Sequence, residues 1–381
     1  MSKAKADESF ADGLAAMRAM IASGDVSGAR ARILALRAGA AEDWARPWLD
    51  EILYELSRYA PQRASVAGDL DVLVEPLHRH PEAIFLLRVG HEQVVGRKRL
   101  SALWLDGTAT SLHGPLISSS MLLGSVIEHR LSEDRVLVFY RCWSDAERRD
   151  AFAQAKSDTS CDVTFPYPML RGRFGREVTS DPAGWVLTPQ IAACLDAGEA
   201  PFRAWTLRWL ARRDLGGCRI FDPGCSTGTF LAAIKAEHPR CYVIGQDLSE
   251  EMVDWARPRL DECHLGDALR TRVPAESIDY LFLRLLVTQS VDTRQAHELF
   301  DVLLARVKVG GHVVVLGYAP ILLSESLFVL LGLAIEQRLA RDPTTDTLFQ
   351  CYVLKKTGPP RASAGELWSQ VAHHTATAGA G

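Results

Sequence analysis

The 381-residue sequence lacks the features that mark several classes of protein. None of its eight cysteines lies three positions from another, and no His-x-x-x-His pair accompanies them. This pattern predicts no metal site and is typical of a reduced compartment. The formal net charge of −4 and the shortness of the Arg-rich patches argue against a nucleic-acid partner.

Long apolar runs are also missing. The first residues, Met-Ser-Lys-Ala-Lys-Ala-Asp-Glu, do not contain the apolar core of a signal peptide. The most apolar later stretch, residues 327–335, is far shorter than the ~20 residues that a membrane span needs. We therefore expect a soluble, cytoplasmic protein without a membrane partner.

The length is enough for two domains, and the pattern divides the chain into unlike parts. Three helices are expected within residues 8–58; they favour a cap or an oligomerisation arm, which suggests a homodimer through the N-terminal region. Strand composition follows at 83–89, 100–105 and 136–140, and a polar helix begins at Ser144, but the topology of residues 70–160 cannot be assigned. The predicted boundaries are a helical segment (1–62), a small α+β cap subdomain (63–163), a connector or lid (164–200), a nucleotide-binding domain (201–357) and a tail (358–381).

The clearest pattern lies at residues 218–247. An apolar strand, Cys218–Phe221, ends in Asp-Pro-Gly-Cys-Ser-Thr-Gly, and a helix follows at once. A second apolar strand then ends in Asp247. Small residues in such a turn let the backbone approach a ligand, and the first N–H groups of the helix point toward it. The pattern is typical of half of a Rossmann-like, doubly wound, mostly parallel α/β sheet.

Regular α/β alternation continues downstream. Ser249 is a suitable N-cap, with two glutamates in the first turn of its helix. Before Pro189 the chain is rich in loops, and two helices are expected to begin at Pro189 and at Pro201. The remaining elements expected are a strand ending at 264–267, strand 278–283, helix 293–307, strand 312–316, helix 323–340 and strand 348–354.

A dinucleotide is one possible ligand for this fold. Its fingerprint is Gly-x-Gly-x-x-Gly, which brings backbone N–H groups onto a pyrophosphate. Here the spacing is Gly-x-x-x-Gly, and Asp222 precedes it. An anionic side chain suits a cationic ligand without phosphates better than a pyrophosphate.

Four features in order resemble the class I methyltransferases that bind S-adenosyl-L-methionine. They are the loop 222–228, Asp247 after the next strand, Gly266-Asp267 after the third strand, and Gly310-Gly311 before the fifth. The resemblance covers about residues 200–355. It implies that Asp247 holds both ribose hydroxyls and that Asp267 meets the adenine amino group. The cofactor-binding residues that we predict are Asp222, Gly224, Ser226, Gly228, Asp247, Leu248, Gly266, Asp267 and Arg284.

The sequence departs from the family pattern in two places. Ser226 replaces the middle glycine of the loop, and its hydroxyl could add a hydrogen bond, for example to the methionine end of the cofactor. After the fifth strand only one further strand is evident, where the family has two that form a reversed hairpin. Either one strand is too irregular to recognise, or the edge of the sheet is modified.

Catalytic residues are hard to name, because the sulfonium is intrinsically reactive and the protein mainly supplies alignment and exclusion of water. Position at the carboxyl ends of strands four and five selects Arg284, Gln289 and Tyr318, and the aromatic connector offers Tyr167 as a lid. Arg284 after an apolar strand needs a partner. An anionic acceptor, the cofactor carboxylate or a structural salt bridge would each provide one.

The resemblance leaves two reactions open. The first is methyl transfer to a small-molecule acceptor in specialised metabolism, with the N-terminal part shaping the acceptor pocket. The second is the reaction of azetidine-2-carboxylate synthases, which are similar in having an N-terminal extension. In these enzymes the amine of S-adenosylmethionine attacks its own γ-carbon and releases methylthioadenosine, so no external acceptor is needed. A non-catalytic scaffold is disfavoured by the intact Asp222, Asp247 and Asp267.

Overall fold

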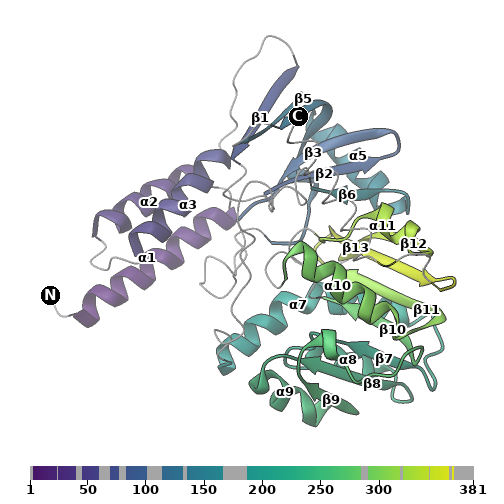
Figure 1. Cartoon of the computed structure of the whole chain (residues 1–381). Coiled ribbons are helices and arrows are strands. Elements are labelled where there is room, and N and C mark those ends of the chain that lie inside the picture. The colour runs from purple at the N-terminus through teal and green to yellow at the C-terminus, as the bar shows by residue number, and fades with distance from the viewer. Residues whose placement is uncertain are drawn as a thin grey trace, which may run out of the picture.

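A computed structural model provides the structure of the chain (Figure 1). The residues that it describes are 3–23, 25–39, 45–59, 69–76, 83–100, 114–131, 135–165, 187–284, 291–317, 321–342, 344–359 and 363.

A seven-stranded mixed sheet forms the C-terminal half. Its first six strands in the chain run in the same direction, and the last one, which lies between the fifth and the sixth, is antiparallel to both, which confirms the predicted doubly wound, mostly parallel α/β fold. Across the sheet the strands are β12 (Leu333–Asp342), β13 (Thr347–Lys356), β11 (Val307–Leu316), β10 (Ile278–Leu283), β7 (Arg219–Asp222), β8 (Tyr242–Asp247) and β9 (Glu262–Leu265). The helices that accompany it are α7 (Pro189–Leu210), α8 (Thr229–Glu237), α9 (Glu250–Ala256), α10 (Thr293–Leu304) and α11 (Glu325–Leu330).

Both faces of this sheet are buried. Successive side chains of a strand point to opposite faces, so a strand covered on both sides must be apolar throughout. In β10, Tyr280 and Phe282 pack in the cluster beneath α7 and α8, whereas Leu281 and Leu283 pack with α10 and α11. This two-sided burial explains the continuous apolar runs of the sequence.

The expected helix over 323–340 is wrong. The helix ends after Leu330, Gly332 adopts φ of +75°, and residues 333–342 form strand β12, which pairs antiparallel with β13. Ala, Glu, Gln, Arg and Leu have good helix propensity, but sheet pairing overrides that weak preference. The reversed hairpin of the family is therefore present.

The two helices expected around residues 189–212 are one helix, α7, with Pro201 in its interior. Thr188 caps it, since its side chain accepts a hydrogen bond from the backbone N–H of Ile191 at 3.2 Å. Phe202 and Trp205 bury themselves against the sheet beside Phe349. This packing offsets the hydrogen bond that the proline removes.

The N-terminal half contains an antiparallel sheet and a helical unit (Figure 1). The expected strands at 83–89 and 136–140 are confirmed, as is the helix that begins after Ser144, whereas four further strands of the described sheet escaped prediction. The sheet order is β1 (Leu70–Pro76), β5 (Arg135–Cys142), β4 (Leu122–Leu131), β3 (Glu92–Arg97), β2 (Ile84–Val89) and β6 (Asp162–Thr164). The helices are α1 (Lys3–Ser23), α2 (Val26–Gly39), α3 (Ala45–Tyr59) and α5 (Asp145–Ser157), and the expected strand at 100–105 lies outside the described residues except for Leu100.

Buried ion pairs connect the helical unit to this sheet. Arg97 of β3 donates to Glu75 of β1 at 2.8 Å and to Glu55 of α3 at 3.0 Å. All three side chains are almost completely buried. Removal of one member would leave an uncompensated buried charge, so this contact fixes the position of α3 on the sheet.

The two sheets are joined at a contact that we call the intersheet seam. It is formed by Asp162 and Val163 of β6 with Gln350 and Tyr352 of β13. The Tyr352 hydroxyl donates to the Asp162 carboxyl, and Gln350 Nε2 donates to the Val163 carbonyl at 2.9 Å. Burial raises the pKa of Asp162 to about 7, although the hydrogen bond from Tyr352 acts to lower it.

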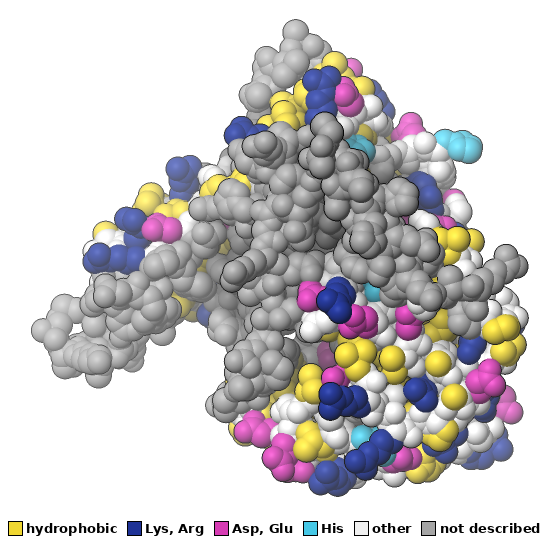
Figure 2. Space-filling model, in the orientation of Figure 1, with side chains coloured by type: hydrophobic (Ala, Val, Ile, Leu, Met, Phe, Trp, Pro, Cys, Tyr) yellow, Lys and Arg dark blue, Asp and Glu magenta, His cyan; other side chains and the backbone are white. Residues whose placement is uncertain are grey.

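The described helices include none that is both long enough and apolar enough to span a bilayer. Figure 2 shows basic and acidic side chains interspersed over the described surface of one face.

The seam predicts an unusual pH dependence of stability. Between pH 4 and pH 7 the unfolded chain releases the Asp162 proton while the folded chain keeps it, so the contribution of Asp162 to stability falls as the pH rises. Asp162→Asn mimics the protonated acid. At pH 7 we expect the Tm of Asp162→Asn to exceed that of the wild type by roughly 2 °C or more, the shift that a gain of about 1 kcal/mol in stability would give. At pH 4 the Tm values of the variant and the wild type should converge.

Thermal unfolding followed by circular dichroism at both pH values checks this. Asp145→Asn, at an exposed position of α5, is the matched control and should not change the pH dependence. A constant difference between Asp162→Asn and the wild type across this range would contradict the assignment.

Candidate functional site

The loop between β7 and α8 is shaped by backbone constraints. Gly228 adopts φ of +75°, and a Cβ at this position would lie 2.8 Å from the Cβ of Ala256, so only glycine fits. Ser226 adopts φ of +51°, the region that favours glycine, which explains why a glycine is usual there. Its hydroxyl lies 3.6 Å from the Met252 sulfur, and its backbone N–H donates to Asp247 at 2.9 Å.

Asp247 ends β8 and is held in place from two sides. Oδ2 accepts the Ser226 N–H and Oδ1 accepts the Ser249 N–H at 3.0 Å. Burial raises the pKa of Asp247, against these hydrogen bonds, which lower it. A carboxylate has about four acceptor positions, so two remain for ligand hydroxyls such as those of a ribose.

Gly266 and Asp267 follow β9, directly beside the end of β8. The Gly266 N–H donates to the Asp247 carbonyl at 2.9 Å, and Asp267 Oδ1 accepts the Leu269 N–H. Gln246, which sequence reasoning missed, donates from Nε2 to the carbonyls of both Gly266 and Asp267. Its place one residue before the acid of β8 was the only signal in the sequence.

Two apolar side chains remain exposed at this edge. Leu248 is 57% exposed and Leu265 is 51% exposed, and they adjoin Asp247 and Gly266 in the chain. Gln246 Oε1 is buried and makes no hydrogen bond with the described residues. Apolar surface next to acceptor carboxylates fits a nucleoside, since a flat base needs apolar contacts and its sugar needs acceptors.

Arg284 lies at the end of β10 in a buried ion cluster that we call the Arg284 cluster, formed with Asp222 and Glu199. Nε donates to Asp222 Oδ2 at 2.6 Å, Nη1 pairs with Glu199, and Nη2 donates to the Gly224 carbonyl at 3.2 Å. Burial lowers the pKa of Arg284, but the charges of Asp222 and Glu199 outweigh it and raise the pKa. Of the partners that the sequence left open, a salt bridge is the one that the structure contains.

Glu199 was not predicted. It belongs to α7, outside the loop motifs, and its contact with Arg284 joins residues 85 positions apart. Burial raises the pKa of Glu199, the Asp222 charge adds to this, and Arg284 opposes it. No pattern in the sequence near Glu199 could have indicated this contact.

The predicted catalytic residues Tyr167, Gln289 and Tyr318 lie outside the described residues. Cys225, inside the loop, is buried, and its thiol donates to the Ser226 carbonyl at 3.7 Å. Among the described residues no group of three or more His, Cys, Asp or Glu side chains has the arrangement of a metal site.

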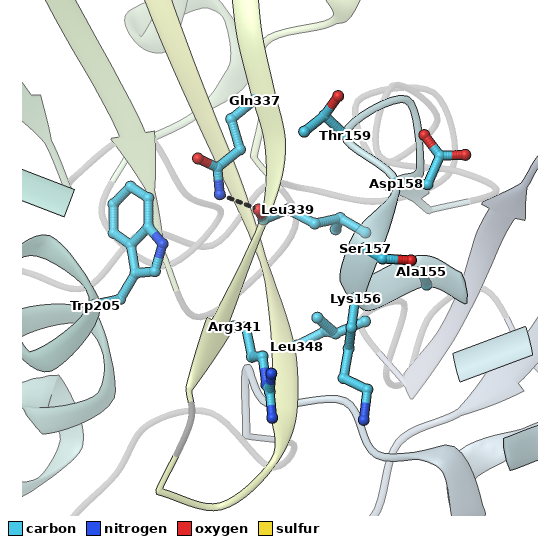
Figure 3. A pocket seen from close by; sticks show the side chains of 10 residues that line it. All are labelled: Ala155, Lys156, Ser157, Asp158, Thr159, Trp205, Gln337, Leu339, Arg341 and Leu348. Carbon is cyan, nitrogen blue, oxygen red and sulfur yellow. Dashed lines mark hydrogen bonds between the residues drawn. The ribbon is translucent and has the colours of Figure 1, made fainter. Parts of the chain in front are cut away.

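A cavity of about 130 Å³ lies elsewhere, between the two halves of the chain (Figure 3). Its wall comes from the end of α5, from Trp205 of α7 and from the hairpin β12–β13, and Figure 3 shows Lys156 and Arg341 at one side of it. It contains none of the predicted cofactor-binding residues, so it belongs to the contact between the halves.

The order of the strands places four charged residues in a row, which we call the row of anchors. Because the order is β10-β7-β8-β9, Arg284, Asp222, Asp247 and Asp267 follow one another along the carboxyl edge of the sheet. In open α/β sheets this edge is where ligands bind. The row fits an extended ligand with a nucleoside at the β8–β9 end and a charged group at the β7–β10 end.

Comparison with known proteins points to the same kind of ligand as the row of residues at the carboxyl edge. Residues 220–311 match the family model described as a methyltransferase domain. The chain is 39% identical over 280 residues to isonocardicin synthase of Nocardia uniformis subsp. tsuyamanensis, covering 72% of this chain and 92% of that protein. It is also 26% identical over 183 residues to ribosomal protein L11 methyltransferase of Methylococcus capsulatus, covering 46% of this chain and 61% of that one.

Among solved structures, an S-adenosylmethionine-dependent methyltransferase from Mesorhizobium loti matches with 31% identity and a TM-score of 0.24, covering 29% of this chain and 50% of that one. The chain belongs to the class I S-adenosylmethionine-dependent methyltransferase superfamily, and S-adenosyl-L-methionine is its cofactor.

The ribose assignment gives a direct test. Asp247→Ala removes the acceptor positions left for the ribose hydroxyls. It should weaken binding of S-adenosylhomocysteine by about 1–3 kcal/mol, which is the typical cost of leaving polar groups without hydrogen-bond partners. Isothermal titration calorimetry measures this. Asp254→Ala, at an exposed acid of the adjoining helix that pairs with Arg257, is the control and should bind like the wild type. Equal affinities for Asp247→Ala and the control would refute the assignment.

Proposed function

We propose that the protein is a small-molecule synthase that uses S-adenosylmethionine as its substrate and closes the aminobutyrate chain into a ring. The nitrogen of the substrate loses a proton and forms a bond to the γ-carbon. The bond from that carbon to sulfur breaks, and its electron pair stays on sulfur. The products are azetidine-2-carboxylate, methylthioadenosine and one proton.

The likeness to isonocardicin synthase supports this proposal, because that relative is named as a synthase rather than a methyltransferase. The 280 aligned residues are more than the chain contains after residue 200. The shared sequence therefore extends into the N-terminal half and is not confined to the cofactor motifs.

The observation that carries the proposal is the Arg284 cluster. It contains two acids and one cation, so it has a formal charge of −1 at the end of the row where the amino-acid part of the ligand would lie. Ring closure requires the protein to hold the amino group and to control its proton. Methyl transfer makes no such demand, because the methyl group and not the amino group then reacts.

Methyl transfer to a small-molecule acceptor is the second candidate. The match of residues 220–311 to a methyltransferase domain favours it. In this case the N-terminal half would shape the acceptor pocket. Tyr167, Gln289 and Tyr318 would then be the residues to examine near the acceptor.

Incubation of the purified protein with S-adenosylmethionine alone distinguishes the two. We expect methylthioadenosine and azetidine-2-carboxylate in equal amounts by mass spectrometry, without an added acceptor. A protein-free sample is needed, because attack by the substrate's own carboxylate releases the same thioether together with a lactone.

Two results would contradict ring closure. One is the absence of azetidine-2-carboxylate above the protein-free level. The other is adenosylhomocysteine that forms only when a small-molecule acceptor is added, which would establish methyl transfer instead. The Asp247→Ala variant should slow either reaction and serves as the control for dependence on the site.

A further inference from the structure

We infer that Glu199 is the binding group for the α-ammonium of S-adenosylmethionine and accepts the proton that ring closure releases. The binding role follows from the geometry of the site. The role as proton acceptor rests on the proposed function. Glu199 lies in α7, outside the residues that match the methyltransferase domain.

The position of Glu199 follows from the row of anchors. The predicted contacts place the adenosine part at Asp267 and Asp247, which follow β9 and end β8. The rest of the ligand must then extend toward the ends of β7 and β10, where Asp222 and Arg284 lie. Glu199 reaches this place from α7 and contacts Arg284 there.

Within the Arg284 cluster, Glu199 is the acid that can still accept hydrogen bonds from a ligand. Asp222 is fully buried, with Oδ1 bonded to the Gly224 N–H and Oδ2 to Arg284. The Glu199 side chain is 16% exposed and uses only Oε1. Its Oε2 makes no hydrogen bond with the described residues. A carboxylate oxygen next to a cluster with excess negative charge suits a cation, and the ammonium is the cation at that end of the ligand.

Packing holds Glu199 where it is. The neighbouring Phe202 contacts Phe349 of β13, with ring centroids 4.9 Å apart. The Arg284 guanidinium lies over the Phe230 ring at 4.6 Å. The carboxylate is therefore preorganised, which reduces the entropy lost when a ligand binds.

The charges around Glu199 set the sign of its titration. Burial and Asp222 raise the pKa of Glu199, whereas Arg284 of β10 and Arg203 of α7 lower it. Arg203 is itself paired with Asp196 at 2.7 Å. A bound ammonium would lower this pKa, so binding should release protons, and affinity should rise with pH while free Glu199 still titrates.

Under the proposed function the same carboxylate has a second task. Once the ammonium is bound beside an ionised Glu199, one proton moves from nitrogen to a carboxylate oxygen. The nitrogen lone pair is then available for attack on the γ-carbon. Glu199 returns the proton to solvent when the products leave.

Calorimetry with two ligands that are not turned over tests the binding role. S-adenosylhomocysteine carries the amino-acid end, and methylthioadenosine lacks it. In Glu199→Gln we expect S-adenosylhomocysteine to bind at least tenfold more weakly and methylthioadenosine to change by less than twofold. Asp254→Asn, at an exposed acid of α9 that pairs with Arg257, is the control and should bind both ligands like the wild type.

The wild-type protein offers an independent measurement. Titration at several pH values from 5 to 8, each in two buffers with different heats of ionisation, should show proton release with S-adenosylhomocysteine in the range where free Glu199 is partly protonated, and none with methylthioadenosine. Unchanged affinity of Glu199→Gln for S-adenosylhomocysteine, equal weakening for both ligands, or no proton release at any of these pH values in the wild type would each overturn the inference. Because neither ligand reacts, these outcomes do not depend on which carbon the enzyme attacks.

Discussion

The rest of the site depends on one constraint, the burial of the Arg284 guanidinium between two carboxylates. A buried charge is costly unless it is paired and hydrogen-bonded, and removing one partner of such a pair typically costs about 3–5 kcal/mol. Arg284 therefore fixes three segments that are distant in the chain: the end of β7, the end of β10 and helix α7. Through Gly224 it also fixes the start of the cofactor loop.

This constraint links the fold to the chemistry. The two acids outnumber the cation, so the β7–β10 end of the carboxyl edge is negative, while the β8–β9 end offers sugar acceptors beside apolar surface. A ligand that is a nucleoside at one end and an ammonium at the other satisfies both ends. In the binding mode that we propose, S-adenosylmethionine lies along the row, and Glu199 is the proton acceptor beside the group that ring closure must deprotonate.

The core of the C-terminal sheet could be predicted from the sequence because two-sided burial makes its strands apolar and glycine or aspartate marks their ends. The strand-end positions of Asp222, Asp247 and Asp267 could be predicted for the same reason, and their contacts with the cofactor stay predictions. Strand β12 was missed because residues with helix propensity form it, and Pro201 wrongly suggested a break in α7. Glu199 could not be found, since only tertiary packing brings it to Arg284. Gln246 donates to backbone carbonyls, which any residue provides, so its place before Asp247 was the only signal of its role.

A crystal structure of the complex with S-adenosylhomocysteine tests the central claim most directly, namely that the ligand lies along the row with its amino group on Glu199. The account predicts the adenine at Asp267, both ribose hydroxyls on Asp247, and the amino nitrogen within about 3.2 Å of Glu199 Oε2. An amino group that points away from α7, with Glu199 bonded to Arg284 alone, would contradict it.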